Sequence, residues 1–157
     1  MTRQATFRIA GTVAALLFLF LSIAQGEENK TQSAKAWFDK GMLLREAGKP
    51  ESSDAFKRAV LELDSYISGK DADQAGLASA YSLRGRCYNL LGDNSNAISD
   101  LNKAVALSPE DADVYYLRSY VYELTGNTGM SLADLKTAAR KGHKKAQDDL
   151  ATKRIEQ

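Results

Sequence analysis

RGRCYNLLGDNSNAISDLNKAVALSP, residues 84–109, consists of two amphipathic segments joined by a Gly-Asp-Asn-Ser turn. Bulky and small apolar residues recur three and four positions apart in both segments, which indicates helices. Gly92 and the polar residues after it predict the end of one helix and the cap of the next. Ser108 and Pro109 then predict a new helix start. The stretch is therefore predicted to be a helical hairpin.

The skeleton of this hairpin recurs on both sides of it. The pairs separated by 34 residues are Tyr81 and Tyr115, Gly85 and Ser119, Tyr88 and Tyr122, Gly92 and Gly126, Leu101 and Leu135, and Ala104 and Ala138. An earlier copy places Trp37, Gly41, Leu44 and Gly48 44 residues before their counterparts. Such a constant offset indicates an internal repeat of helical hairpins.

The repeated pattern resembles the tetratricopeptide repeat: an aromatic residue, a small and a bulky residue, a Gly, then Ala-x-x-x-Leu-x-x-Ala and Pro. The resemblance covers about residues 34–142 and implies an all-α solenoid of three helix-turn-helix hairpins, over about 34–68, 78–111 and 112–142. Residues near Ser65–Gly76 are an insertion that either lengthens the flanking helices or forms a loop. The tail resembles a Sel1-like helix and is predicted, over about 143–154, to cap the last hairpin.

Composition favours one ordinary globular domain. The chain has 157 residues, 44% hydrophobic and 26% charged, with a formal net charge of +1. This balance does not indicate a nucleic-acid partner. Cys87 is the single cysteine, so an intramolecular disulfide is excluded, and it is predicted to be a small buried core residue.

The first 26 residues have the pattern of a secretory signal peptide. Arg3 and Arg8 precede an uncharged apolar run that ends at Gly26, and acids follow it. A retained membrane anchor with the domain outside is the alternative. We expect a short linker over 27–33, a domain over 34–157, and a place of action beyond the cytoplasmic membrane, either periplasmic or secreted. The membrane would be contacted only through the N-terminal segment, if it is uncleaved.

The resemblance implies a binding surface on the concave side, lined by the first helix of each hairpin, where tetratricopeptide proteins bind peptides or partner helices. The residues that it places there are Phe38, Met42, Arg45, Ser82, Arg86, Asn89, Tyr116, Tyr120 and Glu123. Alternatively, Tyr116 and Tyr120 cover the hairpin surface or pack against the capping helix. Carboxylate-clamp repeats, which bind chaperone C-termini, need cations or amides where this chain has Phe38, Ser82 and Tyr116. Clamp-type binding is therefore not expected.

Two arginines each precede an aspartate by 16 residues. The pairs are Arg84 with Asp100 and Arg118 with Asp134, which occupy equivalent positions in successive repeats. We expect them to form structural ion pairs inside the hairpins, without a catalytic role.

Signatures of catalysis are weak. His143 is the single histidine and has no cysteine or second histidine at ligand spacing, so no metal site, cofactor or enzyme activity is predicted. We expect His143 to be exposed to solvent. The sequence thus predicts an exported module that binds a protein or peptide. The alternatives are a structural protein that self-associates as a homo-oligomer and an accessory subunit of an envelope complex.

Overall fold

The computed structural model describes residues 30–69 and 72–155, which form seven helices and no strand. The predicted all-α solenoid is confirmed. The first helix spans residues 30–46. The others are α2 (Ser52–Ile67), α3 (Gln74–Leu90), α4 (Asn94–Leu107), α5 (Ala112–Leu124), α6 (Thr128–Arg140) and α7 (Lys144–Ile155). The predicted signal peptide, residues 1–26, lies outside the described residues.

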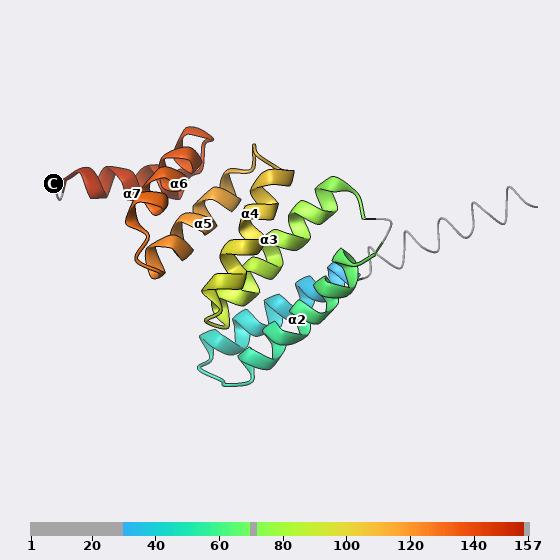
Figure 1. Ribbon diagram of the computed structural model, residues 1–157. Helices are drawn as coiled ribbons and strands as arrows, with labels where there is room; N and C mark the ends of the chain where they lie inside the picture. The colour runs from blue at the N-terminus through green and yellow to red at the C-terminus, as the bar shows by residue number, and fades with distance from the viewer. Residues whose placement is uncertain (1–29, 70–71, 156–157) are drawn as a thin grey trace, which may run out of the picture.

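The helices pair into three hairpins, 30–46 with α2, α3 with α4 and α5 with α6, followed by α7 (Figure 1). Successive hairpins stack from the first, drawn in blue and green, to α7, drawn in red (Figure 1). The first helix already includes residues 30–33, which the sequence analysis assigned to a linker. None of the helices described is long and apolar enough to cross a bilayer.

The turn inside each hairpin has the same backbone geometry. Gly92 has φ +85°, and the Asp93 N–H donates to the Tyr88 carbonyl over 2.9 Å, which satisfies a carbonyl at the end of α3. The same combination of positive φ and hydrogen bond closes the turns at Gly48, Gly126 and Gly142. The Asp93 carboxylate then accepts the Asn96 N–H and caps α4.

Small residues allow the two helices of a hairpin to approach closely. A Cβ added at Gly85 would lie 3.0 Å from Leu101 Cγ, so α3 and α4 touch at this position. In the third hairpin the equivalent residue is Ser119, whose hydroxyl donates to the Tyr116 carbonyl. The serine therefore keeps the position small and satisfies its own polar atom.

The insertion near Ser65–Gly76 lengthens the flanking helices. The helices α2 and α3 have 16 and 17 residues, against 14 and 13 for the equivalent α4 and α5. The Asp73 carboxylate accepts the Gly76 N–H and caps the extended α3. The first two hairpins therefore share a longer interface than a regular repeat would provide.

Apolar side chains form the core between neighbouring hairpins. Cys87 is fully buried with Phe38 and Phe56, and burial raises the pKa of its thiol to about 12. It is therefore the buried core residue that the sequence predicted. At the other end, Ala146 of α7 packs against Leu135 of α6, so α7 covers the last hairpin.

Candidate functional site

A groove of about 810 Å³ runs along the first helices of the hairpins to the turn before α7. It lies over helix 30–46, α3 and α5, and ends at the first turn of α7. Its walls are formed by Met42, Ser79, Ser82, Leu83, Arg86, Asp111, Asp113, Tyr116, Leu117, Tyr120, His143 and Lys145. We call this feature the concave groove.

The repeat explains why these side chains meet. Four lining residues of α3 lie 34 positions before four lining residues of α5: Ser79 and Asp113, Ser82 and Tyr116, Leu83 and Leu117, Arg86 and Tyr120. Since α3 and α5 occupy equivalent places in successive hairpins, equivalent residues lie side by side on the same surface. The concave groove is therefore a direct product of the internal repeat.

Five of the nine residues implied by the family resemblance line the groove: Met42, Ser82, Arg86, Tyr116 and Tyr120. Four others do not. Phe38 is 6% exposed and packs on Phe56 with ring centroids 5.8 Å apart. Asn89 donates to the Asn94 side chain across the turn, while Arg45 and Glu123 are exposed outside the groove.

Phe38 still contributes to the groove indirectly. The Arg86 guanidinium lies over its ring, 4.7 Å from the ring centroid. A cation above an aromatic face is held by the ring quadrupole. The buried Phe38 therefore positions an exposed arginine on the groove wall.

Sequence reasoning missed seven lining residues: Ser79, Leu83, Asp111, Asp113, Leu117, His143 and Lys145. The 34-residue offset would have found some of them, since Asp113 and Leu117 follow Ser79 and Leu83 by one repeat. No repeat signal pointed to His143, which stands where a repeat would have proline.

The prediction that His143 is exposed to solvent is wrong, because only 16% of its side chain is exposed. Its ring stacks on Tyr116 with centroids 4.2 Å apart. Its Nδ1 accepts the Ala146 N–H at the start of α7. The histidine therefore caps α7 and fixes its first turn beside the groove.

Tyr116 faces both the groove and α7. Its hydroxyl donates to Asp149 Oδ2 of α7 over 3.0 Å. Burial, and next the hydrogen bond to Asp149, raise the pKa of Tyr116 to about 12. Both readings of this residue from the sequence thus describe part of its environment: it lines the groove and packs against the capping helix. Tyr120, 49% exposed, presents more of its ring to solvent.

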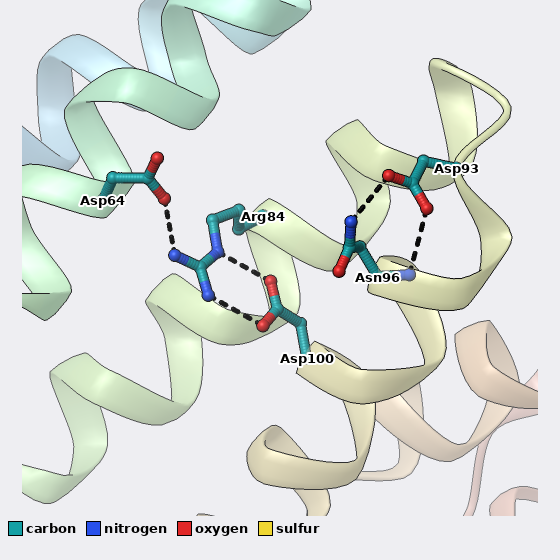
Figure 2. A network of polar contacts seen from close by, with 5 residues as sticks. All are labelled: Asp64, Arg84, Asp93, Asn96 and Asp100. Atoms are coloured by element: carbon teal, nitrogen blue, oxygen red, sulfur yellow. Dashed lines mark hydrogen bonds and ion pairs between the residues drawn. The ribbon is translucent and has the colours of Figure 1, made fainter.

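Arg84 of α3 joins three helices, because its guanidinium lies between Asp64 of α2 and Asp100 of α4 (Figure 2). Its Nε and Nη2 donate to the two carboxylate oxygens of Asp100 over 2.6 and 2.8 Å. Its Nη1 donates to Asp64 of α2 over 2.5 Å. The hydrogen bond to Asp100 raises the pKa of Arg84 further above its usual range. Arg84 therefore ties the second hairpin to the first.

The third hairpin repeats this arrangement. Arg118 donates to both oxygens of Asp134 over 2.7 and 2.8 Å, and to the Asn102 side chain of α4 over 2.8 Å. The side chains of Arg118 and Asp134 are 15% and 10% exposed. The structure thus forms both ion pairs expected from the 16-residue offset, and each arginine also reaches the preceding hairpin. Within the described residues, no group of three His, Cys, Asp or Glu side chains could hold a metal ion.

Comparisons with known proteins agree with this geometry. Residues 85–126 match the family model of the TPR repeat. Among solved structures, the first TPR of Spaghetti (RPAP3) bound to HSP90 peptide SRMEEVD is 18% identical, with a TM-score of 0.58 over 78% of this chain and 90% of that one. The second TPR domain of human RPAP3, in complex with HSP70 peptide SGPTIEEVD, is 20% identical with a TM-score of 0.58 over 80% and 96%.

The Arabidopsis OM64 TPR domain is 19% identical, with a TM-score of 0.58 over 81% of this chain and 97% of that one. A search of curated proteins found no match. Residues 85–126 are thus similar to the TPR repeat, and the described residues share the fold of the TPR domains compared. The Sel1-like character of the closing segment stays a prediction.

Proposed function

We propose that the chain is a protein-interaction module that binds a peptide segment or partner helix in the concave groove. The observation that carries this proposal is the exposed pair of Arg86 and Tyr120, at equivalent positions of neighbouring hairpins. Leu83 and Leu117 lie beside them and supply apolar surface. Arginine and tyrosine around apolar contact area dominate binding hot spots.

Two of the similar solved structures hold HSP90 or HSP70 peptides that end in EEVD. These complexes support peptide binding as a use of the scaffold, but at about 20% identity the likeness concerns the fold. The groove of this chain offers Ser82 and Tyr116 where a carboxylate clamp needs cations or amides. We therefore propose a peptide ligand other than a chaperone C-terminus.

We also propose that the module works outside the cytoplasmic membrane. The support is the N-terminal sequence: two arginines, an apolar run without charges, and acids after residue 26. An exported adaptor or assembly factor fits this pattern. On this proposal the chain recruits a protein and carries no catalytic chemistry of its own.

The test compares capture of partners by the wild type and by the variant Arg86→Ala/Tyr120→Ala. Both side chains are exposed, so their removal is expected to leave the thermal unfolding midpoint nearly unchanged and to lower capture from the exported fraction at least tenfold. The matched control is Arg140→Ala/Leu132→Ala, which removes an exposed arginine and an exposed apolar residue of α6 outside the groove.

Equal capture by wild type and groove variant would contradict the proposal. Capture of the chain by itself alone, with a mass that grows with concentration, would favour the alternative of a self-associating structural protein.

A further inference from the structure

We propose that the groove selects a polarised peptide, with an acidic side chain at Arg86, an apolar one over Leu83 and Leu117, and a basic one at Asp113. This inference rests on the proposed function and specifies the chemistry of its partner. It follows from an uneven distribution of charge along the groove, in which Arg86 lies near the end of α3 and the acids Asp111 and Asp113 lie at the start of α5.

The cationic end is built on Arg86. It lies near the C-terminal end of α3, and its repeat equivalents in the other two hairpins are the uncharged Met42 and Tyr120. The guanidinium is exposed and is held over the Phe38 ring. Because a guanidinium is a planar set of donors, it can bind a carboxylate with two hydrogen bonds. An incoming Asp or Glu side chain is the group that complements this end.

The acidic end lies at the start of α5. The Asp113 side chain is 88% exposed, and its Oδ1 lies 3.5 Å from His143 Nε2, longer than an ordinary hydrogen bond. Asp111 caps the helix by accepting the backbone N–H groups of Asp113 and Val114. Asp113 thus has room on its carboxylate for an incoming cation.

Other charged groups near this end leave a net negative balance. His143 accepts the Ala146 N–H at Nδ1. Lys141 pairs with Glu110 over 2.9 Å, and these two charges cancel. Lys145 also lines the groove and supplies one positive charge, whereas Asp111 and Asp113 supply two negative charges. Asp149, bonded to Tyr116, adds a further carboxylate from α7.

The two ends are spaced for a short extended segment. Arg86 lies seven residues beyond Ser79, the repeat equivalent of Asp113, which is about 10 Å along a helix. The helices α3 and α5 contact each other, which adds a sideways step of about 10 Å. The resulting diagonal of about 14 Å corresponds to about four residues of extended peptide. The middle of that path crosses Leu83 and Leu117.

The experiment selects ligands from a phage library of random 12-residue peptides on the immobilised full-length chain. We expect the enriched peptides to carry a basic and an acidic residue three to five positions apart with an apolar residue between them. Their affinity should fall at least fivefold with Arg86→Glu or Asp113→Lys and on raising the salt from 0.05 to about 0.5 M. Selection on Arg86→Glu should enrich a basic residue in place of the acidic one.

The matched controls are Arg140→Glu on α6 and Asp148→Lys on α7, both exposed and outside the groove, which should leave affinity within twofold. Peptides whose binding needs Tyr120 but which show no charge pattern would overturn this inference and leave the proposed function standing. A selection that yields no peptide dependent on Tyr120 would overturn both.

Discussion

Arg84 donates to Asp100 of its own hairpin and to Asp64 of the preceding one, and its side chain is 14% exposed. Asp100 is more deeply buried, with 4% of its side chain exposed. An unpaired carboxylate at such a site retains the cost of leaving water, whereas an apolar pair of similar volume does not. Removal of one partner is therefore more damaging than replacement of both.

We predict that Arg84→Met lowers the free energy of unfolding by about 3–5 kcal/mol, and that the double variant Arg84→Met/Asp100→Leu loses less than this. Asp64, with 45% of its side chain exposed, stays hydrated in both variants. Urea denaturation measures the effect. The control Lys57→Met, in a solvent-exposed pair with Asp54, should cost about 0.5 kcal/mol or less. A double variant that loses the sum of the losses of Arg84→Met and Asp100→Leu would contradict this account of the Arg84–Asp100 pair.

Because of Tyr116, the protein should become less stable as the pH rises through the alkaline range. Its pKa is raised from the usual value near 10 to about 12, so the unfolded chain releases this proton first as the pH rises. The contribution of the raised Tyr116 pKa to the free energy of unfolding is fully present below about pH 10. It declines by up to about 1.4 kcal/mol per pH unit until about pH 12.

The corresponding variant is Tyr116→Phe, which lacks the ionisable hydroxyl and its bond to Asp149. At neutral pH it should lose about 1–2 kcal/mol. Between pH 10 and 12 its stability should decline less steeply than that of the wild type. Urea denaturation across this range compares the two slopes, and parallel declines would refute the assignment.

The turns between helices depend on glycine where the backbone enters the left-handed region. We predict that Gly92→Ala, at φ +85°, costs about 1–2 kcal/mol because a Cβ is disfavoured there. Gly129→Ala is the control: Gly129 lies within α6, and a Cβ there would meet nothing within 4 Å. It should stabilise the protein by about 0.4–1 kcal/mol. A Cβ at Gly92 would also meet nothing within 4 Å, so equal effects of the two substitutions in thermal or urea unfolding would contradict a cost that arises from backbone conformation.

The order of the helices was predictable because the periodic apolar residues and the glycine turns agree. Gly92, Asp93 and Pro109 mark boundaries that the structure places within a few residues of the prediction. Whether the insertion near Ser65–Gly76 lengthens the flanking helices was not predictable, since its residues suit either a helix or a turn. Packing decides it: Leu63 and Tyr66 of α2 are buried against Ala80 of α3, and these contacts favour longer helices.

The groove was predictable only in part. The repeat register correctly placed Ser82 with Tyr116 and Arg86 with Tyr120 on one surface, because equivalent residues of stacked hairpins meet. It could not show that Phe38 turns into the core, since that depends on how Phe56 fills the space beside Gly41. Nor could it place His143, whose environment is created by the docking of α7 on α5 and α6.

Stacking of three hairpins and α7 creates one continuous surface, and the central claim is that this surface binds a protein partner. The most direct measurement is site-specific photo-crosslinking from the full-length chain in cells of its source organism. The crosslinking amino acid replaces Ser79, an exposed serine on α3 that lines the groove, or Ser99, an exposed serine on α4 that does not.

We predict a crosslinked partner from position 79 and none from position 99, with the product lost when Arg86→Ala/Tyr120→Ala is added. The same partner from both positions, or a product at position 79 that survives the double substitution, would contradict binding in the concave groove.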